Sequence, residues 1–406
     1  MQSKSSHVVK SLNFIKQKKV KMITIVSSFL FVITFAIILN ESFATGGVCF
    51  SSEEMNIDEL EYDGEAVTFA CVSDSSQIEF YMVEINGSVP SELIDMLDNG
   101  KGISFFFHGV GNEITFKNGA FYRFAEEWFN VSGNNICTVT YPFKKDPMTT
   151  FEWFRSLNNL VKSKRLDFAA KLARDIVLGV RDKCVQSEGR QCLRHMSQVD
   201  VSGFSFGAHM AGRACQYILE KTGERVRMLL ALDPSKTPPF GAKIKNSIKR
   251  GHANYVQVIH TSSVVALWEQ LGDIDIFVKQ KTDSSFLDSI IEKHQLAVEI
   301  HMATATKRIY LIADENEKGN GTMVKREENE SFIEPTPKAN ECLVGIYGTM
   351  GQRGKKGKKF TIRLKNSDIS HIMADRPNNY NINFDIDEEM LNELMNNMNN
   401  QANRKE

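Results

Sequence analysis

The sequence predicts an α/β fold in which a mostly parallel central sheet is covered by helices on both faces. Strand-like and helix-like segments alternate through the middle of the chain, which is typical of parallel sheets. Several strand-like segments are continuous apolar runs, as in strands that are buried on both faces. The chain has 406 residues, 42% hydrophobic and 24% charged, which is ordinary for a globular protein.

The elements follow one another in a regular order. A helix is expected over 151–182, in two pieces, and another runs from Ser205 to a stop at Gly223, with small residues along one face. The expected strands cover residues 103–107, 135–141, 198–201, 226–232 and 255–259.

A short motif joins the strand at 198–201 to the helix that follows it. Residues 203–209 read Gly-Phe-Ser-Phe-Gly-Ala-His. A serine between two glycines, after a strand and before a helix, is how an α/β-hydrolase exposes its nucleophile. Gly203 and Gly207 let the helix and strand approach closely around Ser205. The motif therefore predicts an α/β-hydrolase fold with Ser205 as nucleophile.

A serine hydroxyl needs a base to take its proton and an acid to orient that base. In α/β-hydrolases the acid comes next along the chain. Asp233 follows the apolar strand at 226–232 and precedes Pro234. The carboxyl end of a parallel strand faces the ligand crevice, so we assign Asp233 as the catalytic acid. The alternative is an aspartate that caps a turn before Pro234.

Upstream, an apolar strand ends in His108-Gly109-Val110. Hydrolases place one oxyanion amide in this loop and the other after the nucleophile. We expect the backbone N–H groups of Val110 and Phe206 to form the oxyanion hole. His108 and Gly109 are expected to support the loop, as Gly203 and Gly207 support the turn.

Together these pieces resemble the pancreatic-lipase family, and within it the insect and venom phospholipase A1 group. The matching segments keep the family order over roughly residues 105–277 and include Leu232-Asp233-Pro234, residues 258–261, and residues 272–277. A later segment at 342–346 also resembles that group. The resemblance implies a serine esterase that acts on the sn-1 acyl bond of phospholipids.

The resemblance also indicates the base. The family pattern, Cys-x-His-x-Arg-Ala, matches at His294, although Leu296 replaces the arginine and the cysteine is missing. His301 is the rival base. His260 is expected to be a buried residue at a strand end, and His252 to lie on a loop surface.

The resemblance implies further properties. The short segment between Asp275 and His294 implies a short lid, which in this family accompanies phospholipases. We expect no colipase, no cofactor and a monomer that meets lipid at a membrane or lipoprotein interface. The alternatives are a triacylglycerol lipase, a membrane-tethered esterase, and a catalytically weak or inactive lipid-binding relative similar to yolk proteins.

The amino-terminal segment predicts secretion. Lysines precede an uncharged apolar run over 22–39, and Ser42 and Ala44 suit a signal-peptidase site. We expect residues 1–44 to be a signal peptide, with a retained signal anchor as the alternative. Residues 45–375 would form the lipase domain, and 376–406 a polar tail rich in Asn and Glu.

The cysteines and the net charge indicate which disulfides, metal sites and nucleic-acid contacts to expect. Secretion permits disulfides, and we predict one between Cys184 and Cys192, with Cys215 a buried thiol. No zinc-ligand spacing occurs, so no metal site is expected. The net charge of −1 gives no field that would recruit nucleic acid. Sequons that permit glycosylation lie at Asn86, Asn130, Asn320 and Asn329.

Overall fold

The chain divides into two compact units, residues 1–56 and 57–406, and the second contains the sheet. The computed structural model describes residues 56–74, 80–110, 120–141, 156, 158–186, 192–236, 244, 246–280, 286–315, 321–325, 334–348 and 357–373. The predicted signal segment at 1–44 and the tail at 376–406 lie outside these ranges.

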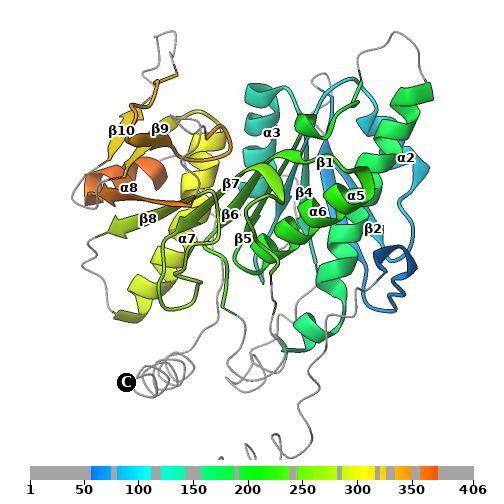
Figure 1. Cartoon of the computed structure of the whole chain (residues 1–406), viewed down its shortest axis with the longest axis horizontal. Coiled ribbons are helices and arrows are strands. Elements are labelled where there is room, and N and C mark those ends of the chain that lie inside the picture. The colour runs from blue at the N-terminus through cyan, green and yellow to red at the C-terminus, as the bar shows by residue number, and fades with distance from the viewer. Residues whose placement is uncertain are drawn as a thin grey trace, which may run out of the picture. The chain divides into compact units, whose positions relative to one another are not determined.

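One sheet joins the twelve strands among the described residues (Figure 1). They are β1 (Val67–Val72), β2 (Tyr81–Ile85), β3 (Ile103–Phe107), β4 (Asn135–Thr140), β5 (Val199–Phe204), β6 (Val226–Leu232), β7 (Ala253–His260), β8 (Ile274–Gln280), β9 (Ile309–Asp314), β10 (Thr322–Lys325), β11 (Glu341–Leu343) and β12 (Lys358–Leu364). Their order is β10-β9-β12-β8-β7-β6-β5-β3-β4-β1-β2, with β11 paired to β9.

The centre of the sheet is parallel and its edges are antiparallel. The run from β4 to β12 through β3, β5, β6, β7 and β8 is parallel. Strand β1 pairs antiparallel with β4 and β2, and β9 pairs antiparallel with β12, β10 and β11. This confirms the predicted α/β-hydrolase fold class. The antiparallel edges were not predicted from the sequence.

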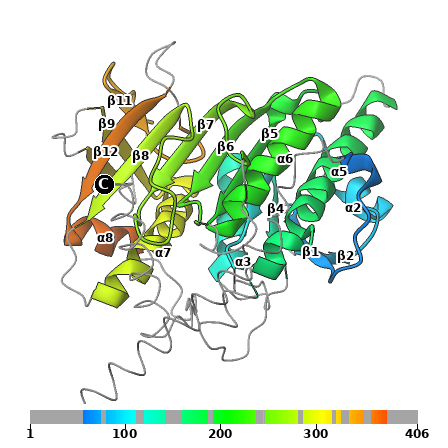
Figure 2. The same ribbon diagram turned by 60° about the horizontal axis from the view of Figure 1, so that its bottom comes forward.

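Helices cover both faces of the sheet (Figure 2). Helices α2 (Ser91–Leu97), α5 (Arg165–Gln186) and α6 (Phe206–Thr222) lie on one face. Helices α3 (Ala120–Ser132), α7 (Phe286–Ala305) and α8 (Asn366–Met373) lie on the other. The two short 3-10 helices are Ile57–Glu59 and Met196–Gln198. The helix predicted over 151–182 does break, at Ser163–Lys164, and its second piece continues to Gln186.

The central strands are apolar throughout because both of their faces are buried. Along β3, Phe105 and Phe107 join the apolar core beneath α5 and α6, whereas Phe106 joins the core beneath α3 and α7. All five residues of β3 are buried. Alternate side chains of one strand therefore stabilise both layers.

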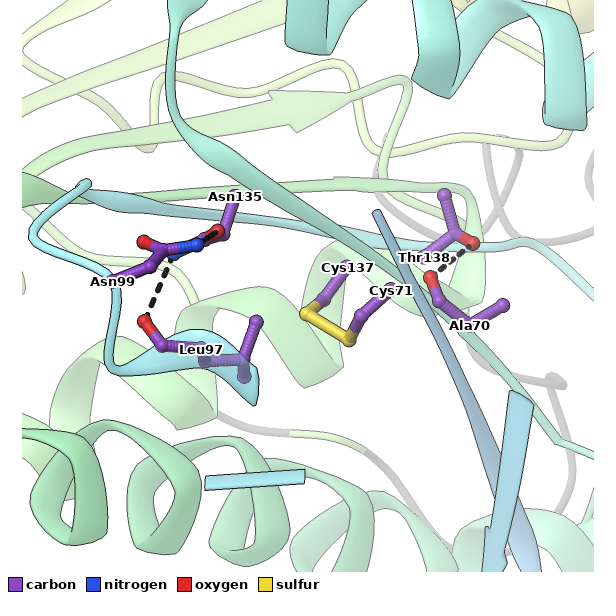
Figure 3. The surroundings of a disulfide bond; sticks show 7 residues. All are labelled: Ala70, Cys71, Leu97, Asn99, Asn135, Cys137 and Thr138. Carbon is purple, nitrogen blue, oxygen red and sulfur yellow. Dashed lines mark hydrogen bonds between the residues drawn. A yellow bond between two sulfur atoms is a disulfide. The ribbon is translucent and has the colours of Figure 1, made fainter. Parts of the chain in front are cut away.

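A buried disulfide joins the antiparallel strand β1 to the parallel part of the sheet (Figure 3). Cys71 on β1 lies directly opposite Cys137 on β4, and the two are bonded. Nearby, Thr138 donates a hydrogen bond to the carbonyl of Ala70 at 3.1 Å. The predicted Cys184–Cys192 disulfide is also present, and Cys215 is a buried free thiol as predicted.

Candidate active site

The turn from β5 into α6 places Ser205 in an unusual backbone conformation. Its φ is 55° and its ψ is −119°. A non-glycine residue pays about 1–3 kcal/mol in such a region, and strain of this kind clusters at functional sites. The Ser205 N–H donates to the carbonyl of Leu232 at 2.9 Å, which ties the turn to the end of β6.

Two glycines allow this turn to pack closely. A Cβ added to Gly203 would lie 2.3 Å from the carbonyl oxygen of Gly207. A Cβ added to Gly207 would lie 2.2 Å from the carbonyl oxygen of His108. Any larger side chain at either position would push α6 away from β5 or from the loop after β3.

Three side chains from separate elements form one hydrogen-bonded chain. The Oγ of Ser205 lies 2.9 Å from Nε2 of His294, which comes from α7. The other ring nitrogen of His294, Nδ1, lies 2.6 Å from Oδ2 of Asp233. All three residues are buried, Ser205 at 4% exposure, Asp233 at 0% and His294 at 5%. The geometry suits transfer of the serine proton to the imidazole, whose cation the carboxylate would stabilise.

The second carboxylate oxygen of Asp233 is also hydrogen-bonded. Its Oδ1 accepts hydrogen bonds from the backbone N–H groups of Thr261 at 2.7 Å and Ser262 at 3.0 Å. These amides follow β7, so the neighbouring strand orients the acid. The alternative role, in which Asp233 caps its own turn, is not what these contacts show.

The loop after β3 lies against the serine. A Cβ added to Gly109 would lie 3.2 Å from Cβ of Ser205 and 2.9 Å from the ring of Phe204. Val110 is buried. Phe206 is the first residue of α6, and the N–H groups of the first turn of a helix have no partner within that helix. The structure thus brings the residues predicted for the oxyanion hole to the same turn as Ser205.

Phe204, the residue before the candidate nucleophile, contacts the candidate base. Its ring centroid lies 4.6 Å from that of His294. Leu296, which stands where the family has arginine, is buried in the core beneath α7. Apolar packing therefore holds α7 in place here.

His301 lies apart from the serine. Its Nε2 is 3.3 Å from Oγ of Ser202, and its ring packs among Phe106, Phe124 and Trp128. Burial lowers the pKa of His301 to about 3. Burial likewise lowers the pKa of His108 to about 3.

The other histidines hold loops. His260 lies buried at the end of β7, as predicted, with Nε2 3.0 Å from Oδ1 of Asp275 and Nδ1 2.8 Å from the carbonyl of Leu267. His252 lies in the loop before β7, as predicted, but it is partly buried rather than fully exposed, and this desolvation lowers its pKa to about 4.

His209 links α6 to the turn after Asp233. Its Nδ1 lies 2.7 Å from Oγ of Ser247, and its Nε2 lies 2.8 Å from the carbonyl of Ser235. Lys236 adds a second link, since its ammonium donates to the carbonyls of Ser263 and Val264 at 2.7 and 3.0 Å. These contacts could not be predicted from the sequence, because they join loops that meet only in the fold.

A serine–histidine–aspartate chain at a strand-to-helix turn of a mostly parallel sheet is the arrangement of the α/β-hydrolase class. Within that class, the resemblance to the lipase family is confirmed. The Lipase family model matches residues 189–314, a segment that includes Ser205, Asp233 and His294.

Curated relatives match over shorter segments. The chain is 30% identical over 83 residues to "Phospholipase A1 2" of Polistes dominula, which is 20% of this chain and 26% of that protein. It is 28% identical over 85 residues to "Phospholipase A1" of Vespula squamosa, covering 21% and 28%. It is 31% identical over 80 residues to "Vitellogenin-3" of Drosophila melanogaster, covering 20% and 19%. The matches thus span about a quarter of these relatives or less.

Solved structures give a distant likeness. The "Bacterial Heroin Esterase" is 12% identical with a TM-score of 0.25, covering 61% of this chain and 74% of that one. An esterase of Pyrobaculum calidifontis is 13% identical with a TM-score of 0.24, covering 62% and 75%. We draw nothing on activity from likenesses this distant.

Proposed function

We propose that the protein is a secreted serine esterase that hydrolyses the sn-1 acyl ester of phospholipids. The observation that carries this proposal is the hydrogen-bonded chain from Ser205 through His294 to Asp233. A serine hydroxyl at its ordinary acidity is a weak nucleophile, and an adjacent oriented base activates it.

The reaction would run through an acyl-enzyme. Ser205 attacks the ester carbonyl while His294 takes its proton, and His294 then returns the proton to the leaving lysophospholipid hydroxyl. Water, deprotonated by His294, attacks the acyl-serine and releases the fatty acid. Asp233 keeps Nδ1 of His294 protonated, so that Nε2 faces the serine as acceptor.

The amides of Val110 and Phe206 would stabilise the oxyanion of each tetrahedral intermediate. Support comes from the packing of Gly109 against Ser205 and from the place of Phe206 as the first residue of α6. Such donors stabilise charge that develops only in the transition state, so they lower the barrier rather than merely binding substrate. No step in this scheme uses a metal or an organic cofactor. Among the described residues, no cluster of three or more His, Cys, Asp or Glu side chains could hold a metal ion.

The choice of phospholipid rests on the relatives. The relatives from Polistes dominula and Vespula squamosa that match this chain are named phospholipase A1. A membrane or lipoprotein surface would present the substrate to a monomeric enzyme, without a colipase.

Secretion is supported by the cysteines. Both disulfides among the described residues require an oxidising compartment to form and persist. Two of the sequon residues, Asn86 and Asn130, are exposed and accessible to glycosylation. Within the described ranges, no helix is long and apolar enough to cross a bilayer.

Release of fatty acid and lysolipid tests the function. A phosphatidylcholine with different acyl chains at sn-1 and sn-2, presented in vesicles and in mixed micelles, should lose its sn-1 chain with the wild type but not with Ser205→Ala. A triacylglycerol emulsion run in parallel tests the lipase alternative. No release from any lipid by the wild type would overturn the proposal.

A second candidate is a lipid-binding protein without catalysis, which the match to Vitellogenin-3 favours. Such a protein would bind vesicles equally well as wild type and as Ser205→Ala, and would hydrolyse nothing. The intact serine–histidine–aspartate chain is the reason we place the esterase first.

A further inference from the structure

The loop that carries the predicted oxyanion donor is held through both backbone polar groups of His108. The His108 N–H donates to the carbonyl of Val139 on β4 at 3.1 Å. The His108 carbonyl accepts a hydrogen bond from the hydroxyl of Tyr141, also at 3.1 Å. Tyr141 directly follows β4, so the end of one strand fixes the start of the loop.

The same carbonyl faces the helix that begins after Ser205. A Cβ on Gly207 would lie only 2.2 Å from the His108 oxygen, so this oxygen sits against the first turn of α6. The loop, the helix start and the Tyr141 hydroxyl therefore meet at one point.

Tyr141 also reaches the second predicted donor. Its ring centroid lies 6.1 Å from that of Phe206 in a tilted contact, and both side chains are buried, at 2% and 3% exposure. Aromatic pairs within about 7 Å stabilise each other beyond simple burial. One side chain thus contacts Phe206 and the residue two positions before Val110.

We propose that Tyr141 is a positioning residue that sets the distance between the two oxyanion donors, the amides of Val110 and Phe206. The inference rests on the proposed function. Tyr141 does not touch substrate. It acts by holding the His108 carbonyl with its hydroxyl and the Phe206 side chain with its ring.

The chemistry of Tyr141 suits this role. Burial raises the pKa of its hydroxyl well above the ordinary value, so the group is protonated and can donate at neutral pH. Oxyanion donors act only when they lie within hydrogen-bond distance of the developing charge. A loop displaced by a fraction of an ångström would therefore bind substrate normally but stabilise the transition state poorly.

The test is Tyr141→Phe, which removes the hydroxyl and keeps the ring. Loss of a whole oxyanion donor lowers kcat by about a hundredfold or more, so we expect about a tenfold fall for a misplaced one. KM on a soluble p-nitrophenyl ester should stay within about twofold, because ground-state binding is unchanged. Titration with a fluorophosphonate gives the concentration of active enzyme, so that unfolded protein does not lower the apparent kcat.

A boronic acid inhibitor supplies a readout that a purely structural role would not change. Boronates add to the serine as a tetrahedral anion, so the inhibition constant should rise in Tyr141→Phe by about the same factor as kcat/KM falls. Phe206→Leu, which keeps the amide but removes the ring contact, should shift both quantities in the same direction.

The matched control is Tyr217→Phe. Tyr217 is a buried tyrosine on α6 whose hydroxyl donates to Asp167 on α5, outside the proposed site. The Tyr217→Phe variant should be less stable than the wild type but should keep the same kcat per titrated active site.

Unchanged kcat and boronate affinity in Tyr141→Phe, with an active wild type, would overturn the inference and leave the esterase proposal intact. An inactive wild type would overturn the esterase proposal instead. If Tyr141→Phe does not fold, the Phe206→Leu measurements decide, and no change in them counts against the inference.

Discussion

His301 donates a hydrogen bond from Nε2 to the hydroxyl of Ser202, which lies three residues before Ser205 on the strand that leads to it. The single proton of Ser202 goes to the carbonyl of Phe105 at 2.9 Å, so His301 must supply the proton of the other bond. Burial lowers the pKa of His301 to about 3, so its ring is uncharged at neutral pH and bonded to Ser202, whereas Ser205 is bonded to His294.

This arrangement predicts which histidine is the base. His294→Ala should lower kcat/KM on a soluble ester by at least about 10⁴-fold, as loss of a triad base does elsewhere. His301→Leu places an apolar side chain among Phe106, Phe124 and Trp128, and its kcat/KM should stay within about threefold of the wild-type value. A large loss in His301→Leu together with an active His294→Ala would reverse the assignment.

Buried histidines make stability depend on pH. The pKa of His301 falls from 6.5 to about 3 on folding, because burial disfavours the charged ring. Below pH 6.5 the unfolded chain binds a proton that the folded protein does not, so the free energy of unfolding falls as the pH falls from about 6.5 towards 3. His108, His209 and His252 shift in the same direction.

Denaturant unfolding at several pH values measures this dependence. Each such histidine contributes a slope of about 1.4 kcal/mol per pH unit within its window. His301→Leu should reduce the slope between pH 4 and 6 by about one proton. An equal slope in His301→Leu and the wild type would show that His301 is not neutral and buried.

Lys236 should stabilise the turn that holds the acid. Its ammonium donates to the carbonyls of Ser263 and Val264, directly after the Ser262 amide that binds Asp233. Lys236→Met keeps the aliphatic stem and should lower the free energy of unfolding by about 1 kcal/mol. Lys338→Met, at an exposed lysine paired with Glu341, serves as control and should change stability by less than about 0.5 kcal/mol.

Thermal unfolding of the two lysine variants provides the comparison. Since the Asp233 carboxylate keeps its bonds to the Thr261 and Ser262 amides only while the loop is held, kcat should also fall, by a few fold, in Lys236→Met alone. Equal melting temperatures for both variants would rule out this supporting role.

The two disulfides should contribute unequally to stability. Cys71 and Cys137 are 66 residues apart, whereas Cys184 and Cys192 are 8 apart. On chain-entropy grounds the longer loop contributes about 4 kcal/mol and the shorter about 2.5 kcal/mol. Cys71→Ala with Cys137→Ala should therefore unfold at lower urea than Cys184→Ala with Cys192→Ala. The opposite order would contradict the entropic account.

The sequence predicted the part of the fold that local patterns specify. The apolar run at 103–107 and the glycines around Ser205 are local patterns of a few residues. The parallel centre of the sheet and the strand-to-helix turn could therefore be predicted. Strands β9 to β12 could not, because their place in the sheet depends on pairing partners elsewhere in the chain, as Lys358–Leu364 depends on Ile274–Gln280.

The candidate site, too, could be predicted from the sequence only in part. Ser205 and Asp233 stand at strand ends that the sequence marks, but the choice between His294 and His301 needed the orientation of α7, since both lie on one helix seven residues apart. No sequence motif predicted the hydrogen bond of the Tyr141 hydroxyl, because its acceptor is a backbone carbonyl 33 residues away.

The central claim is that Ser205 is acylated during ester hydrolysis. Rapid acid quench of the wild type with an excess of p-nitrophenyl ester, followed by trypsin and tandem mass spectrometry, should find the acyl group in the peptide between Arg194 and Arg213. That peptide contains Ser197, Ser202 and Ser205. The acyl group should lie on Ser205, in amounts matching the initial burst of p-nitrophenol. Turnover without any acylated serine, or acylation at another serine, would contradict the account.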